Sequence, residues 1–131
     1  MGDDMNIIMN FVCKGKQFEL QDESMIDIKF DCVHKPNSHN TLPSGIERRM
    51  DYGYADISKE LSPKAFNETL NNYLELFKKN KKQLVNWGLE EIVLYLTFGY
   101  ESQFNWEFDP ILLGKLYDLG ITLAISAYER D

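Results

Sequence analysis

Two thiols and two imidazoles are the side chains of this sequence that are best suited to chemistry. They are Cys13, Cys32, His34 and His39. Zinc prefers thiolate and imidazole ligands, but the spacing lacks the close cysteine pair of a zinc-finger knuckle. We therefore interpret them as two core thiols beside two loop histidines, and we expect no metal and no cofactor. The alternative is a small enzyme or metal-binding protein that uses Cys32, His34 and His39, since a strand through Cys32 would place His34 on the same face.

Sequence motifs for covalent or phosphate chemistry are missing. Ser44 is followed by glycine but does not stand in the G-x-S-x-G pattern of a nucleophile elbow. Cys32 and His34 could act as thiolate and base, yet the sequence supplies no third group to orient them. Phosphate loops, the dinucleotide fingerprint and the H-E-x-x-H zinc motif do not occur. We expect a protein that is not an enzyme.

The net charge of −7 and the pI near 4.8 limit the partners that the protein can bind. A negative surface repels phosphate groups, so we expect neither nucleic acid nor a membrane as a partner. The same charge speeds the encounter with a basic protein, although it also serves solubility.

Length and composition indicate one globular domain over residues 1–131. The 44% hydrophobic and 27% charged residues are typical of a folded domain, and a chain of this length needs no disulfide for stability. The sequence has two cysteines, no apolar run of about 18 residues and no signal-peptide pattern at its N-terminus. These features predict a cytoplasmic protein.

The first half of the chain predicts strands separated by loops. Strands are expected at residues 5–13, 21–33 and 51–57, with an irregular segment at 34–50 that is rich in proline, glycine and short polar side chains. Apolar and polar residues alternate within 21–33, which favours a strand over a short helix capped by Asp22.

A long helix is the clearest local prediction. Ser62 is a suitable N-cap, and Pro63 fits the first helical position because its missing N–H would have no partner there. Apolar residues then recur three and four positions apart, and Gly88 is placed to end the helix. The lysine-rich run at 78–82 is either an exposed turn of this helix or a break between two shorter helices.

A strand with two apolar faces is predicted at residues 90–100, and we expect it to lie at the centre of the sheet. Residues 103–108 also alternate, and they are predicted to form its hairpin partner. If one face of this hairpin contacts the core, aromatic rings stay partly exposed beside carboxylates. Aromatic anchors flanked by acidic groups would select a basic partner. The residues predicted to bind this partner are Tyr100, Glu101, Trp106 and Glu107.

The C-terminal segment reads as cap, helix, stop and strand. Asp109 is an N-cap, Pro110 takes the first helical position, and Gly120 ends the helix before a strand at 121–129. The expected buried stripe of this helix is Leu112, Leu113, Leu116 and Leu119. Together the elements predict an α+β fold, a mostly antiparallel sheet of five or six strands with one long and one short helix on one face.

The same C-terminal segment carries a family resemblance. The match rests on a leucine pattern, a glycine stop and a strand that ends near a tyrosine: Pro110, Leu112, Leu113, Leu116, Leu119, Gly120 and Tyr128. On these residues the sequence, over 51–129, resembles a bacterial family known as domain of unknown function four-two-seven-nine. The first third departs from the family, with Tyr52 and Tyr54 where a tryptophan would be expected.

The resemblance implies a small α+β protein that acts as an immunity or accessory partner in a bacterial toxin system. We therefore expect a non-enzymatic protein-binding domain, in the concrete form an immunity-like inhibitor of a basic toxin. A further alternative is a self-associating structural domain in which an exposed edge strand pairs with its copy.

Overall fold

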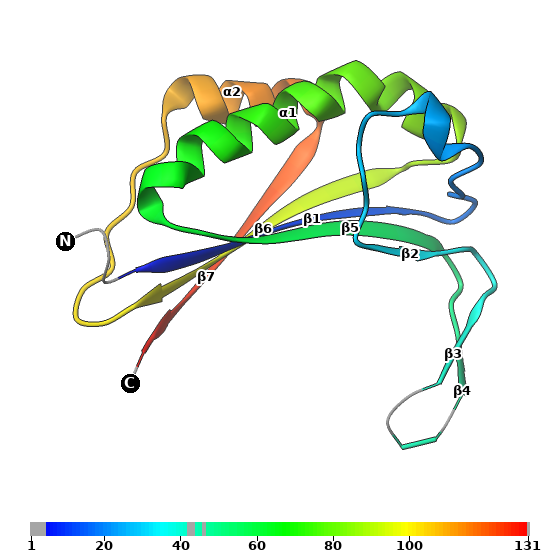
Figure 1. The fold of residues 1–131 in the computed structure, drawn as a ribbon, viewed down its shortest axis with the longest axis horizontal. Coiled ribbons are helices and arrows are strands. Elements are labelled where there is room, and N and C mark those ends of the chain that lie inside the picture. Colours follow the sequence, from blue (N-terminus) through cyan, green and yellow to red (C-terminus); the bar gives the residue numbers. More distant parts are fainter. Residues whose placement is uncertain (1–4, 42–43, 46, 131) are drawn as a thin grey trace.

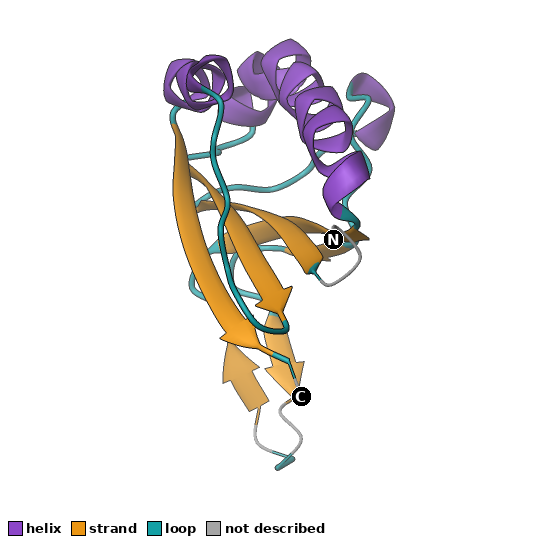
Figure 2. Ribbon diagram, turned by 90° about the vertical axis from the view of Figure 1, so that its left-hand side faces the viewer, coloured by secondary structure: helices purple, strands orange, loops and turns teal. Residues whose placement is uncertain are grey.

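The computed structural model describes residues 5–41, 44–45 and 47–130. Two helices lie on one face of a twisted five-stranded sheet, and none of these described residues forms a helix on the opposite face (Figures 1 and 2). The sheet consists of β1 (Asn6–Gly15), β2 (Cys32–His34), β5 (Gly53–Leu61), β6 (Glu91–Tyr100) and β7 (Ile121–Glu129). The other elements are the 3-10 turn η2 (Glu23–Met25), the hairpin strands β3 (His39–Thr41) and β4 (Glu47–Arg49), and the helices α1 (Pro63–Asn86) and α2 (Pro110–Leu119).

The strand order is β2-β5-β1-β6-β7, and every pair is antiparallel except β6 and β7. β6 and β7 are parallel because the chain between them crosses over the sheet through α2. The predicted α+β class, with a mostly antiparallel sheet and one long and one short helix, is confirmed.

The hydrophobic core lies between α1 and the strand β1 at the centre of the sheet. Alternate residues of β1 point toward the helices, and Phe11 stands opposite Ile57 of β5 and Leu94 of β6. The ring of Phe11 lies 4.9 Å from that of Phe77 and 5.9 Å from that of Tyr73, both on α1. These contacts hold the long helix across the middle of the sheet.

The predicted helix ends are confirmed. Ser62 caps α1 with its side chain, Pro63 begins the helix, and α1 continues without a break through the lysine-rich run. In α2 the carboxylate of Asp109 accepts a hydrogen bond from the Ile111 N–H at 2.7 Å. Gly120 ends α2 in the left-handed conformation at φ 66°, which glycine adopts without strain. The predicted burial of Leu113 is wrong, because 42% of it is exposed.

The predicted strand over 21–33 is wrong for most of its length. Only Cys32–His34 pairs with the sheet, and Asp22 instead caps the turn η2. Ile26 and Ile28 are buried while Asp27 and Lys29 are exposed, so the alternation reflects burial of a loop and not strand pairing.

The predicted hairpin partner at 103–108 is also wrong, since the chain from 103 to 109 contains neither helix nor strand. The second neighbour of β6 is β7, which reaches that position after the crossover through α2. As predicted, β6 lies inside the sheet, between β1 and β7, while β1 is the middle strand of the five. The segment 34–50, expected to be irregular, contains the short hairpin of β3 and β4.

Two glycines provide a matched test of the fold. A methyl group on Gly53 would lie 1.6 Å from the carbonyl oxygen of Phe18, whereas one on Gly114 in α2 meets nothing within 4 Å. We expect Gly53→Ala to lower the free energy of unfolding by about 3 kcal/mol or more, through the displaced backbone. Gly114→Ala should raise it by up to about 1 kcal/mol, because alanine favours the helix. Urea denaturation measures both, and equal effects would contradict the close approach at Gly53.

Candidate partner-binding surface

Residues 16–31, here called the acidic loop, leave β1 and return to the sheet at β2. The loop closes the end of the layer between helix and sheet, beside the C-terminus of α1 (Figure 1). Backbone hydrogen bonds fix it at both ends: the Glu19 N–H donates to the Trp87 carbonyl at 3.0 Å, and the Asp31 N–H to the Asp56 carbonyl at 2.7 Å. The side chain of Asp31 also accepts from the Ser58 N–H at 2.8 Å. The loop is therefore tied to α1 on one side and to β5 on the other.

Asn80 holds the middle of the acidic loop and is the one buried polar side chain among the residues that the structure describes. Its Oδ1 accepts from the Asp27 N–H at 3.2 Å, and its Nδ2 donates to the Leu76 carbonyl at 2.8 Å. Beside it, Lys79 lies 2.5 Å from the Asp27 carboxylate, although both side chains are well exposed and their attraction is screened by water. A buried polar group with its hydrogen bonds made fixes the position of its partner, so Asn80 sets the place of the loop.

Asp22 stabilises the turn at the tip of the acidic loop. Its carboxylate accepts from the Ser24 N–H at 3.0 Å and from the Ser24 hydroxyl at 2.6 Å. These hydrogen bonds favour the ionised form and lower the pKa of Asp22. The tip of the loop therefore keeps its negative charge to lower pH than a free aspartate would.

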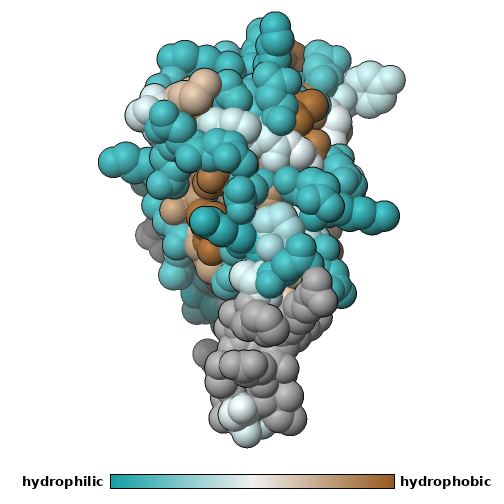
Figure 3. Space-filling view, turned by 90° about the vertical axis from the view of Figure 1, so that its right-hand side faces the viewer, coloured by the Kyte–Doolittle hydropathy of each residue, from teal (hydrophilic) through white to brown (hydrophobic). Residues whose placement is uncertain are grey.

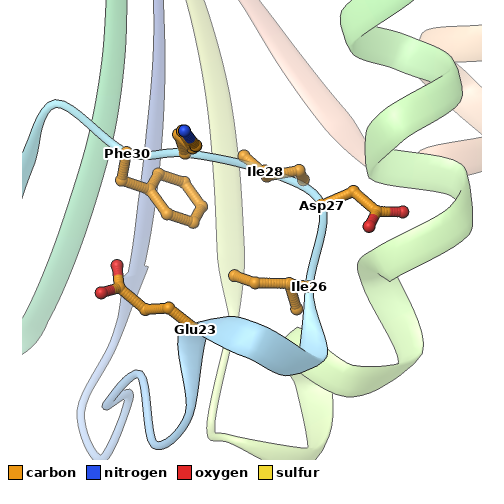
Figure 4. A pocket seen from close by; sticks show the side chains of 6 residues that line it. Glu23, Ile26, Asp27, Ile28 and Phe30 are labelled. Carbon is orange, nitrogen blue, oxygen red and sulfur yellow. The ribbon is translucent and has the colours of Figure 1, made fainter.

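The acidic loop lines a half-open cavity of about 560 Å³. The side chains of Glu23, Ile26 and Phe30 lie around it, while Asp27 turns away toward α1 (Figure 4). Its lining is Glu23, Ile26, Asp27, Ile28, Lys29 and Phe30. The surface on this side of the molecule shows a few apolar groups between hydrophilic side chains (Figure 3). The cavity thus combines the apolar side chains of Ile26, Ile28 and Phe30 with the charged side chains of Glu23 and Lys29.

The acidic loop carries more negative than positive side chains. It contains five carboxylates and two lysines: Glu19, Asp22, Glu23, Asp27 and Asp31 against Lys16 and Lys29. Met25, with 56% of its surface exposed, adds a flexible apolar group next to the cavity. The arrangement is suited to a ligand group with an apolar stem and a positive end. The alternation within 21–33 predicts a strand, so the sequence alone does not reveal this site.

The predicted binding residues lie at the opposite end of the molecule, where the chain runs from β6 to α2 (Figure 1). The ring of Trp106 meets that of Phe66 edge-on at 5.1 Å and that of Phe98 at 5.3 Å. Tyr100 lies 5.8 Å from Phe104. These aromatic rings close the second end of the core, so Trp106 is already in use as a core contact.

The two carboxylates predicted to bind the partner differ in their surroundings. Glu101 lies 3.5 Å from the guanidinium of Arg130, whose backbone N–H donates to the Tyr100 carbonyl at 2.6 Å. Glu107 is exposed. The partner-binding role of these residues stays a prediction.

Cys32 and His34 share the face of the sheet that carries no helix. The thiol of Cys32 lies 3.4 Å from Nε2 of His34, as their spacing on a strand predicts. Next to them on β5, the Tyr54 hydroxyl donates to the Asp56 carboxylate at 2.5 Å, and the rings of His34 and Tyr54 are 5.7 Å apart. Burial and this hydrogen bond raise the pKa of Tyr54, so it remains a neutral donor.

The other members of the thiol and imidazole set do not join this pair. Cys13 is fully buried on the helix-covered face, and burial, with a smaller effect from Asp56, raises its pKa to about 12. The side chain of His39 lies outside the part of the chain that the structure describes. Within the described residues, no group of three histidine, cysteine or carboxylate side chains is arranged to hold a metal ion.

No protein-family model, curated protein or solved structure matches this chain. Among the residues with described structure, no helix is both long and apolar enough to cross a membrane.

Replacing Asn80 should loosen the acidic loop. In Asn80→Ala the Asp27 N–H loses its acceptor, and we expect the free energy of unfolding to fall by about 1–3 kcal/mol. The exposed Asn72→Ala on the same helix should change it by less than about 0.5 kcal/mol. Hydrogen exchange of the Asp27 amide should quicken in Asn80→Ala only. An unchanged exchange rate there would show that Asn80 does not hold the loop.

The two thiols should differ in reactivity. A thiol reagent is expected to label only Cys32 in the native protein and both cysteines after unfolding, because Cys13 is buried and keeps its proton. The raised pKa of Cys13 also predicts a loss of stability at alkaline pH. Between pH 9.0, its ordinary value, and about 12, the unfolded chain releases this proton and the folded chain does not. Cys13→Ala should reduce that alkaline loss; native labelling of Cys13 would contradict its burial.

Proposed function

We propose that this chain is a non-enzymatic protein-binding domain that docks a basic partner protein on its acidic loop. In the concrete form of the proposal it is an immunity-like inhibitor of a basic bacterial toxin and acts in the cytoplasm. The observation that carries the proposal is the cavity of about 560 Å³ with Ile26 and Phe30 in its walls and Glu23 at its rim.

A lysine or arginine side chain has the chemistry that this cavity fits. Its aliphatic stem can contact Ile26 and Phe30 while its charged end reaches the carboxylate of Glu23. Arginine is enriched among the residues that dominate binding energy at protein interfaces. The hydrogen bonds of Asn80 and Asp31 hold the loop before a partner arrives, which reduces the entropy lost on binding.

The overall charge supports a basic partner. A net charge of −7 attracts such a protein over a distance and speeds its association at low salt. The resemblance of residues 51–129 to the bacterial family named above points to the same class of partner, through toxin systems.

One observation favours a second candidate function, a small enzyme with a nucleophilic thiol. The Cys32 thiol lies 3.4 Å from His34, and Tyr54 and Asp56 are on the same face of the sheet. Asp56, however, accepts its hydrogen bond from Tyr54, so the carboxylate that could orient the histidine is engaged elsewhere. His39, the third residue of that sequence-based alternative, would have to join from the β3 strand. The binding role is therefore the better supported of the two.

Two pairs of conservative substitutions distinguish the ends of the molecule as docking surfaces. Asp22→Asn with Glu23→Gln removes two charges from the acidic loop, and asparagine retains the capping function. Glu101→Gln with Glu107→Gln removes two charges at the opposite end. We expect the first pair to weaken binding of a hexa-arginine peptide at least about tenfold and the second to change it little.

Amide chemical shifts during the peptide titration should move at Ile26, Ile28 and Phe30, and raised salt should weaken binding. A hexa-glutamate peptide is the control. The same variants should then be compared for binding of a toxin domain encoded beside the gene. If only the pair at Glu101 and Glu107 weakens binding, the partner docks at the end that the sequence predicted. If neither pair does, charge does not drive docking.

A further inference from the structure

The outer edge of β7 is open along nine residues. β7 pairs with β6 on one side, and none of the residues that the structure describes pairs with its other side (Figure 2). Unpaired backbone donors and acceptors along an edge can be satisfied by a strand from another chain. The opposite edge of the sheet differs, because β2 there is only three residues long.

Apart from Glu129 at its end, β7 has no charge, proline or glycine to protect it as an edge strand. Ile125, in the middle of the strand, is 48% exposed although it lies on the face that the helices cover elsewhere. A long uncharged edge with an exposed β-branched residue favours pairing with another strand.

The neighbouring helix continues this apolar surface. α2 lies over β7, and Leu113 and Tyr117, one turn apart, are 42% and 84% exposed. Lys115 reaches across to Asn71 of α1 at 3.0 Å, which identifies the side of α2 that faces α1. On the helical period, Leu113 and Tyr117 lie on the side away from α1, above the open edge.

The charges of this surface indicate which partner it fits. A basic protein would find little attraction along β7, because the carboxylates of the proposed docking site belong to the acidic loop beside α1 and β5. A second copy presents the same uncharged strand. In an antiparallel pair centred on Ile125, Glu129 stands opposite Ile121 and Leu123 opposite Ala127, so like charges do not meet.

We propose that β7 and the adjoining side of α2 form a self-association surface on which a second copy of this chain docks. The two β7 strands pair antiparallel about a two-fold axis at Ile125, and the two five-stranded sheets become one continuous sheet. Leu113 and Tyr117 of each copy lie above the joint and face their counterparts. This inference is independent of the proposed binding of a basic partner.

Charge reversal at the centre of the pair tests the proposal. In the wild type, sedimentation or light scattering across a concentration series should show a dimer. Ile125→Lys and Ile125→Glu each place like charges opposite one another, and we expect each to raise the dimer dissociation constant at least about tenfold. Mixing the two variants in equal amounts should restore the dimer, because lysine then faces glutamate. Circular dichroism confirms that both variants fold.

Val33→Lys is the matched control, since Val33 is 43% exposed on β2, at the edge of the sheet opposite β7; it should leave the dimer unchanged. Raising the salt from about 0.05 M to about 0.5 M should strengthen the dimer by screening the charge of −7 on each copy, whereas binding of a basic peptide should weaken. A wild type that stays monomeric up to ~1 mM overturns the proposal, as does an Ile125→Lys variant that still dimerises. Asp22→Asn with Glu23→Gln should not affect the dimer, so failure of one proposal is distinguishable from failure of the other.

Discussion

The contact between α1 and the central strand β1 is the interaction on which the rest of the structure depends. Phe11 lies against Phe77 and Tyr73, and burial of such large rings provides much of the free energy that holds helix and sheet together. Because α1 is one uninterrupted helix, this contact also fixes the position of both ends of α1. At the C-terminal end, Asn80 and the Trp87 carbonyl receive the acidic loop. Near the N-terminal end, Phe66 receives the ring of Trp106. A single helix thus positions a polar, charged surface at one end and an aromatic closure at the other.

The two ends are held by different interactions, and this difference is the reason that we propose the acidic loop as the docking site. Aromatic rings at the β6 to α2 connection bury apolar area and contribute to stability, which leaves them little capacity for a partner. The acidic loop is held instead by directional hydrogen bonds, from the Asp27 N–H to Asn80 and from the Ser58 N–H to the carboxylate of Asp31. Such contacts fix the backbone while carboxylates such as Glu23 stay in water, where they attract cations at no cost in desolvation before binding.

Local signals in the sequence predicted the elements that local chemistry determines. Ser62 and Pro63 mark the start of α1, and Asp109, Pro110 and Gly120 mark both ends of α2, because caps and stops depend on neighbouring residues. Contacts between residues far apart in the sequence cannot be predicted from such local signals. Alternation over 21–33 records that Ile26 and Ile28 are buried, but it does not show whether the backbone pairs with a strand or hydrogen-bonds to a helix side chain 53 positions away, as Asp27 does with Asn80. Likewise, the apolar pattern of β6 predicts a strand inside the sheet. It does not specify that one neighbouring strand is β7, which follows the crossover through α2. The cavity of the acidic loop depends on these long-range contacts, so the sequence alone does not predict it.

The charged acidic loop and the nearly uncharged strand β7 lie on different sides of the molecule, and this separation makes the two proposals compatible. The acidic loop returns to the sheet beside β5, whereas the uncharged strand β7 forms the far edge, with β1 and β6 between them. Joining two copies through β7 would therefore leave both acidic loops at the outer sides of the continuous sheet, free to bind. Two identical sites on one rigid body increase the apparent affinity for a partner that is itself repeated or immobilised, without any new contact at either site. The same arrangement keeps the two acidic loops far apart. The repulsion between two copies that each carry a net charge of −7 is therefore weak at the joint, and salt screens it further.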